Sequence, residues 1–185
     1  MRHTLFRILA VMVLALVGFA ANSAGATPPG GPYYATPSWD QTLPASTRFI
    51  VLSNMSNAAV LDRETGLVWE QSLSTLSFTW EQAHGHCNGL STGGRLGWRL
   101  PSLQELASLV DPTVAPPGLR LPAGHPFQNV RWTHYWSATE SAADAGNAWF
   151  VIFRTAEGEG FVDHHPKSID DGVWCVRGGL AMDPQ

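Results

Sequence analysis

The stretch FTWEQAHGHCNG, residues 78–89, decides the fold because it predicts a helix that carries one of the chain's two cysteines. Thr79 is followed three positions later by Gln82, and this pair forms a capping box, which is a typical helix start. Gly89 is a typical helix terminator. We therefore expect a helix from Trp80 to Asn88, and its orientation decides where the cysteine points.

The cysteine of this helix is expected to face the core. Trp80, Ala83 and Cys87 fall at positions i, i+3 and i+7, so they share one helix face. The second cysteine, Cys175, lies 88 positions later in the last β-like segment. Two cysteines in an exported chain most often form one disulfide, although two buried free thiols stay open. A bridge of this span would stabilise the fold by about 4–5 kcal/mol in the chain-entropy model.

The N-terminal residues predict export. Arg2 and Arg7 precede an almost entirely apolar run at 8–20, and the small residues at 24–26 form a cleavage pattern. We interpret residues 1–26 as a signal peptide and expect a periplasmic or secreted product. The apolar run is too short to cross a bilayer comfortably, so no membrane span is expected after cleavage. A retained membrane anchor is the alternative.

Charge argues against a nucleic-acid partner. Cleavage after Ala26 would leave 159 of the 185 residues, enough for one domain with a real core. It would remove two of the 11 basic residues and none of the 15 acidic ones, which leaves a net charge of −6. Such a surface does not attract polyanions. All eight tryptophans follow the predicted signal peptide, and tryptophan serves both cores and flat binding surfaces.

The remaining pattern predicts an α+β domain. We expect a Pro-rich linker at 27–46, one domain at 47–179 and a tail at 180–185. A second capping box predicts a helix at 103–110. Strands are expected at 48–52, 59–62, 67–70, 134–139, 148–155, 160–164 and 172–177. This order predicts two helices packed on a mainly antiparallel sheet, with long loops between the strands.

Four blocks of the sequence resemble the Lcl C-terminal domain family. The blocks are Asp62 with Thr65–Trp69, Trp98–Ser102 with Glu105–Leu106, Phe127 with Tyr135–Thr139, and Cys175–Gly178. This bacterial family of unknown function is also found at the end of a collagen-like adhesin. The resemblance implies a C-type lectin-like fold, related to the fold of formylglycine-generating enzymes. In that fold the cysteine of the first helix pairs with one in the last strand, which implies a Cys87–Cys175 disulfide.

The resemblance also implies where a ligand would bind, because long loops and adjoining strands build the ligand surface of lectin-like folds. In this chain that surface maps onto Trp132, His134, His164, His165, Lys167 and Asp170. Trp132 is suited to stacking on a ligand. The alternative is an ordinary solvated loop. The triplets Glu-Pro-Asn, Gln-Pro-Asp and Trp-Asn-Asp of calcium-dependent lectins do not occur, so we expect no calcium site.

No metal site or cofactor is predicted. On a helix, His84 and His86 point to nearly opposite sides, and His164 and His165 point to opposite faces of a strand. Neither pair chelates an ion alone. A zinc site that joins one histidine of each pair with the aspartate at 163 or 170 stays open.

These patterns predict a binding module rather than an enzyme. We expect an exported, non-catalytic binding or adhesion module that recognises a glycan or protein ligand through its long loops without calcium. The G-x-S-x-G match at 89–93 lacks the preceding strand of a hydrolase elbow. One alternative is an exported enzyme of the formylglycine-generating-enzyme superfamily, which would need reactive cysteines. Another is a subunit of a surface assembly that docks through its Pro-rich arm.

Overall fold

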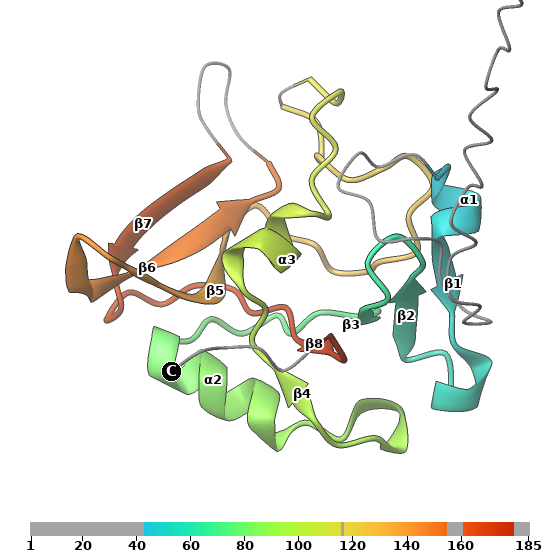
Figure 1. Cartoon of the computed structure of the whole chain (residues 1–185), viewed down its shortest axis with the longest axis horizontal. Helices are drawn as coiled ribbons and strands as arrows, with labels where there is room; N and C mark the ends of the chain where they lie inside the picture. Colours follow the sequence, from blue (N-terminus) through green and yellow to red (C-terminus); the bar gives the residue numbers. More distant parts are fainter. Residues whose placement is uncertain (1–42, 116, 155–160, 180–185) are drawn as a thin grey trace, which may run out of the picture. The chain divides into compact units, whose positions relative to one another are not determined.

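The computed structural model describes residues 43–115, 117–154 and 161–179. The helices and strands are α1 (Ala45–Arg48), β1 (Phe49–Val51), β2 (Ala59–Asp62), β3 (Val68–Glu70), α2 (Trp80–Gly89), β4 (Trp98–Arg99), α3 (Leu103–Ala107), β5 (His134–Ser141), β6 (Asp144–Ile152), β7 (Val162–Pro166) and β8 (Val176–Arg177). The α+β class is confirmed, with one difference: the strands form two antiparallel sheets rather than one (Figure 1). The predicted signal peptide, most of the predicted linker and the predicted tail lie outside the described residues.

The first sheet joins the two ends of the domain. Its strand order is β1-β2-β3-β8-β4, with every neighbouring pair antiparallel. The strands expected at 59–62 and 67–70 form an antiparallel hairpin, β2 and β3, and Gly66 adopts the positive φ of 72° that the turn between them requires. The last strand, β8, lies between β3 and β4, so the sheet is complete only when the end of the domain returns to its beginning.

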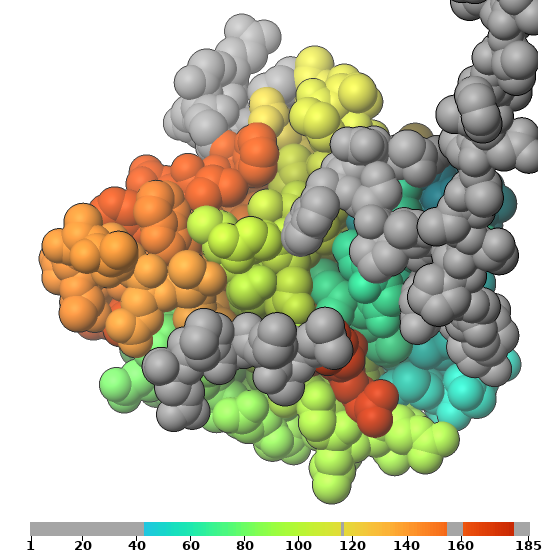
Figure 2. All heavy atoms as spheres, viewed as in Figure 1, coloured from blue at the N-terminus to red at the C-terminus, as the bar shows by residue number. Residues whose placement is uncertain are grey.

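The second sheet consists of β5, β6 and β7 in sequence order. Its residues gather on one side of the face shown in Figure 2, and α3 lies between them and the first sheet (Figures 1 and 2). Apolar residues fill two buried clusters. One contains Phe49, Leu106, Tyr135 and Trp174, and the other contains Ala83, Trp98, Trp136 and both cysteines. Within the described part of the chain, no helix is long and apolar enough to cross a membrane.

Helix α2 forms as its sequence predicts. The Thr79 hydroxyl accepts a hydrogen bond from the Gln82 backbone N–H (3.4 Å), and the Gln82 side chain accepts one from the Thr79 N–H (3.1 Å), so the capping box is present. The helix extends to Gly89, which is its last residue rather than the residue after it. Ala83 and Cys87 are buried on the predicted inner face.

The Cys87–Cys175 disulfide is confirmed. The two Cα atoms are 5.4 Å apart, and both residues are fully buried in the cluster beneath α2. The bridge therefore ties α2 to the segment that leads into β8. Only the end of that segment, β8, pairs as a regular strand. The preceding residues pass through the core, where the Trp174 indole N–H and the Cys175 backbone N–H donate hydrogen bonds to Glu70 instead.

Several boundaries differ from the sequence expectations. Helix α1 begins at Ala45, two residues before the expected domain start at Thr47, and Arg48 ends this helix instead of opening a strand. Helix α3 ends at Ala107 rather than at Val110. Leu106, Leu109 and Val110 are nevertheless all buried, because the chain continues inward after the helix ends.

A buried ion cluster holds the first hairpin. Arg48 donates two hydrogen bonds to the Asp62 carboxylate (2.9 and 2.7 Å) and lies 3.1 Å from a Glu64 carboxylate oxygen. It also donates to the Ser108 carbonyl oxygen (2.9 Å). All three charged side chains are almost fully buried. Since one arginine serves two buried carboxylates, the hairpin and the residues after α3 are held in one arrangement.

Replacing both cysteines by alanine should lower the free energy of unfolding by about 2–5 kcal/mol, because the unfolded chain regains the freedom that the bridge removes. Denaturant unfolding of the Cys87→Ala/Cys175→Ala variant and of the wild type measures this loss. Wild-type protein unfolded in reductant is the matched control and should lose a similar amount. Equal stability of variant and oxidised wild type would contradict the prediction.

Glu70 lies beside the disulfide in an unusual environment for a carboxylate. It is buried, and its two oxygens accept hydrogen bonds from the Cys175 backbone N–H (3.1 Å) and the Thr92 hydroxyl (3.4 Å). Burial raises the pKa of Glu70 from its ordinary 4.5 to about 7, and the two hydrogen bonds oppose that rise only in part. The folded protein therefore binds a proton here at pH values where the unfolded chain has lost it.

The free energy of unfolding should accordingly decrease as the pH rises from 4.5 to 7, which are the unfolded and folded pKa values of Glu70. Glu70→Gln cannot ionise, so it should match the wild type near pH 4. Above pH 7 it should be more stable by up to about 3 kcal/mol. Urea unfolding across this pH range measures the difference.

Glu105→Gln provides a control of opposite sign. Burial alone would raise the pKa of Glu105, but hydrogen bonds from Arg99 and Ser102 and the charge of Arg99 outweigh it and lower the pKa. This carboxylate stabilises the fold above its unfolded pKa, and that contribution is lost as the pH falls. Glu105→Gln should therefore be less stable than the wild type at neutral pH. If Glu70→Gln and Glu105→Gln changed the free energy of unfolding in the same direction at neutral pH, the opposite pKa shifts of the two residues would be contradicted.

Candidate functional site

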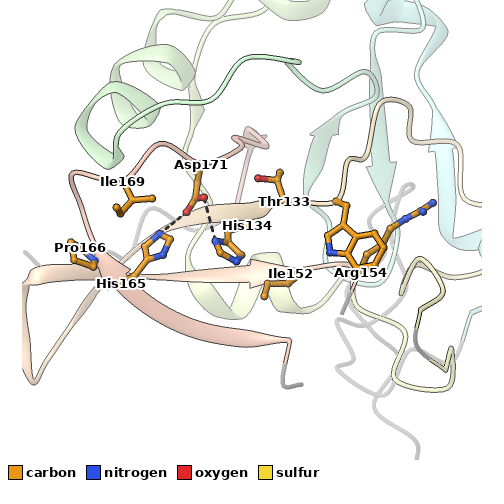
Figure 3. A pocket seen from close by; sticks show the side chains of 9 residues that line it. Thr133, His134, Ile152, Arg154, His165, Pro166, Ile169 and Asp171 are labelled. Atoms are coloured by element: carbon orange, nitrogen blue, oxygen red, sulfur yellow. Dashed lines mark ion pairs between the residues drawn. The ribbon is translucent and has the colours of Figure 1, made fainter. Parts of the chain in front are cut away.

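A pocket of about 530 Å³ opens on one face of the second sheet. It is lined by Trp132, Thr133, His134, Ile152, Arg154, His165, Pro166, Ile169 and Asp171. These residues come from the start of β5 and the two positions before it, the end of β6 and the segment just after it, the end of β7, and the segment that follows β7. In Figure 3, the imidazoles of His134 and His165 and the carboxylate of Asp171 point toward one another at one end of the pocket, and Arg154 lies at the other.

Strand register explains why two histidines from distant positions meet. His134 pairs with Ile152, and His165 pairs with Ala148. Alternate residues of a strand share a face, so the partners at 148 and 152 of β6 point to the same side. Both histidines therefore project from that side of the sheet, although 31 positions separate them in the sequence.

Asp171 reaches the histidines from a separate segment that the backbone fixes in place. Its N–H donates to the Phe78 carbonyl oxygen (2.9 Å), and its carbonyl oxygen accepts from the Phe78 N–H (2.8 Å). The next residue, Gly172, donates its N–H to the His134 carbonyl oxygen (3.0 Å). Asp171 is only 3 % exposed, so its carboxylate is directed into the protein rather than into solvent.

The three polar side chains lie within direct contact of one another. His165 Nε2 is 2.6 Å from Asp171 Oδ2, and His134 Nδ1 is 3.4 Å from Asp171 Oδ1. The short contact is an ion pair by distance, but neither His165 Nε2 nor Asp171 Oδ2 has a hydrogen-bond partner among the described residues.

Aromatic rings set the orientation of both imidazoles. The His134 ring stacks on Phe150 with a centroid distance of 4.3 Å, and the His165 ring packs against Phe150 at 4.5 Å and Trp136 at 4.7 Å. Trp136 is itself fixed, because its indole N–H donates to the Phe78 carbonyl oxygen (2.9 Å). The imidazoles are therefore positioned by the core beneath them.

The structure brings together half of the residues that the sequence nominated for ligand binding. Trp132, His134 and His165 all line the pocket, and Trp132 is 64 % exposed at its rim. Trp132 thus offers an aromatic face to a molecule in the pocket.

The other nominated residues do not line this pocket. His164 points to the opposite face of β7, as expected from strand alternation, and packs against Trp149 with a centroid distance of 4.8 Å. Lys167 pairs with Glu140 (2.9 Å) and lies over the Trp80 ring. Asp170 is exposed. Lys167 therefore links β5 to α2. The acidic residue that lines the pocket is Asp171 rather than its neighbour Asp170.

Two charged pocket residues, Asp171 and Arg154, were not among those nominated from the sequence. Asp171 lies two positions before the apolar run 173–176, and such an acid must find a partner once buried. Arg154 directly follows the apolar run 148–153, which is a similar signal. Neither signal identifies a pocket, because only the tertiary fold brings the segments that carry Asp171 and Arg154 together.

The described part of the chain is thus an α+β domain closed by one disulfide, with an aromatic and imidazole-lined pocket on one face of its second sheet. Residues 58–177 match the model of the Lcl C-terminal domain family. This match covers well over half of the 185 residues, so the chain belongs to that family, as the sequence blocks indicated. No curated protein matches the chain.

Gly172→Ala should disturb the pocket, because there is no room for a methyl group at this position. A Cβ there would lie 2.9 Å from Thr133 Cγ2 and 3.0 Å from both the His134 carbonyl oxygen and Tyr135 Cε1. The segment that carries Asp171 would have to move away from β5. We expect a loss of about 1–3 kcal/mol in the free energy of unfolding, measured with denaturant.

Gly85→Ala is the matched control. Gly85 lies in α2, and a Cβ added there would meet no atom within 4 Å. Alanine should therefore leave stability unchanged or raise it by about 0.5–1 kcal/mol through its better helix propensity. A Gly172→Ala protein as stable as the wild type would show that the segment is not held tightly against β5.

Proposed function

We propose that this protein is an exported, non-catalytic binding domain of C-type lectin-like fold that recognises a glycan in the pocket around Trp132. The observation that carries the proposal is the exposed indole of Trp132 at the rim of a pocket that also holds charged and imidazole groups. An aromatic face stacks on the apolar face of a sugar ring, and polar groups select its hydroxyl or acidic substituents.

The dimensions and composition of the pocket support a small saccharide ligand. Its volume of about 530 Å³ falls within the usual range of roughly 300–1,000 Å³ for small-molecule sites. Ile152, Pro166 and Ile169 supply apolar wall, and Arg154 supplies a planar donor suited to hydroxyl or carboxylate oxygens. A few convergent polar groups in a mainly apolar wall are typical of such sites.

The disulfide supports both the compartment and the fold in this proposal. Disulfides persist in oxidising compartments, which agrees with the signal-like sequence at 1–26. A bridge from the first long helix to the terminal β-segment is also the pairing that the C-type lectin-like resemblance implies. The pocket combines imidazoles with one carboxylate rather than the oxygen-rich ligand set of calcium sites, which favours calcium-independent recognition.

The disulfide also weighs against the enzyme alternative. Chemistry of the formylglycine-generating type needs reactive cysteines, and both cysteines of this chain form the buried bridge. A buried disulfide is not a poised nucleophile. Binding rather than redox catalysis is therefore the function that these side chains support best.

Trp132→Ala should weaken glycan binding by about tenfold, which corresponds to the loss of one stacking contact. The test begins with the disulfide-intact protein on an array of glycans and surface proteins, followed by calorimetric titration of each hit. The melting temperature should not change, because the Trp132 side chain is mostly exposed.

Leu96→Ala is the matched control, since Leu96 is a comparably exposed apolar residue (72 %) that does not line the pocket. It should bind glycan like the wild type. Unchanged glycan affinity in Trp132→Ala would place recognition elsewhere, and array hits restricted to proteins would replace the glycan assignment by a protein ligand.

A further inference from the structure

The three polar side chains at the inner end of the pocket have the composition of a metal site. His134, His165 and Asp171 each offer one ligand atom, and these atoms all lie within 4.8 Å of one another. Two imidazole nitrogens with one carboxylate oxygen suit divalent transition metals such as zinc rather than calcium or magnesium, which prefer all-oxygen sets. We propose that these three residues bind one zinc-class divalent ion, a role that goes beyond glycan recognition and does not depend on it.

The three side chains are close enough to reach one tetrahedral ion after a small adjustment. Zinc lies about 2.0–2.2 Å from nitrogen and carboxylate ligands, so neighbouring ligand atoms of a tetrahedral site are separated by about 3.3 Å. The 3.4 Å between His134 Nδ1 and Asp171 Oδ1 already has this value. His165 Nε2 lies 2.6 Å from the other carboxylate oxygen, Oδ2, so a rotation of the Asp171 carboxylate is needed to present one oxygen to an ion shared by both imidazoles.

The buried carboxylate is the observation that points to an ion rather than to a chance cluster. Asp171 is 97 % buried, and among the described residues no donor is directed at its Oδ2. A buried carboxylate oxygen without a hydrogen bond is costly unless a cation compensates it. His165 Nε2 is likewise buried without a hydrogen-bond partner in the described part of the chain, although it lies beside that oxygen. Both atoms face the point where an ion would sit.

The site is built on rigid supports, as metal sites require. Phe150 and Trp136 hold the two imidazoles, and the paired backbone of Phe78 and Asp171 holds the carboxylate. Three side chains leave the fourth tetrahedral position to a molecule from the pocket. A bound ion would therefore be reachable by a ligand that also contacts Trp132, which lines the same pocket, or Arg154, which lies at its other end (Figure 3).

The chain provides matched controls at neighbouring positions. His164 is next to His165 but points to the opposite face, where it packs on Trp149. Asp170 is next to Asp171 but is exposed and does not line the pocket. His164→Ala and Asp170→Asn thus remove the same chemical groups as His165→Ala and Asp171→Asn while leaving the proposed ligands in place.

The experiment titrates zinc chloride into tag-free, metal-stripped protein without any glycan, by calorimetry and by equilibrium dialysis with elemental analysis. Wild type, His164→Ala and Asp170→Asn should each bind one zinc per chain. His165→Ala and Asp171→Asn should bind at least about 100-fold more weakly, since losing a group that only supports a ligand already costs roughly 10–100-fold. Cobalt should give the visible absorption of a tetrahedral site in the first group alone.

Circular dichroism and melting curves in metal-free buffer check that each variant folds, and His165→Asn replaces His165→Ala if the latter does not. Zinc should raise the melting temperature of the wild type and both controls but not of Asp171→Asn. The proposal is overturned if the wild type binds no stoichiometric zinc, or if zinc binding is unaffected by His165→Ala and Asp171→Asn. Equal loss in the controls would assign the ion to a different cluster.

Discussion

The return of the chain's last described segment into the first sheet is the constraint on which the domain depends. Strand β8 lies between β3 and β4, and the Cys87–Cys175 disulfide fixes the residues just before it beneath α2. Closing such a long loop is entropically costly for a chain without a cross-link. The bridge removes much of this entropic cost from folding. Glu70 also accepts a hydrogen bond from the same segment, although burial of its carboxyl group raises its pKa.

The same constraint positions the pocket. Asp171 precedes Cys175 by only four residues, so the segment that the disulfide fixes also carries the pocket's buried carboxylate. Gly172 allows this segment to lie directly against the start of β5, where His134 stands. The second sheet contributes His165 through its own register. Stability and the candidate site are thus linked by covalent structure, and a change in the closure of the domain would move one of the three polar groups relative to the other two.

Local signals in the sequence predicted most of the elements, whereas the pairing of distant segments escaped them. Capping boxes identified the starts of α2 and α3, because the residues that satisfy the first N–H groups of a helix are adjacent in sequence. The division into two sheets and the insertion of β8 depend on contacts between residues far apart, which periodicity does not encode. The candidate site shows the same division. Trp132, His134 and His165 were nominated from their places in loops and strands, but Asp171 became visible only when the fold placed it beside them.

Charge connects the two proposals for the pocket. The full chain carries a net charge of −4, which attracts cations and repels acidic ligands at long range. Within the pocket, Arg154 and Asp171 carry opposite charges. A divalent ion held by His134, His165 and Asp171 would change that balance to a clear positive excess and present an open coordination position toward Trp132. The metal-free pocket would then favour neutral sugars, whereas the metal-bound pocket would favour sugars with an acidic oxygen. Occupancy by the ion would therefore decide ligand class as well as affinity, which makes metal content the first quantity to control when ligands for this domain are compared.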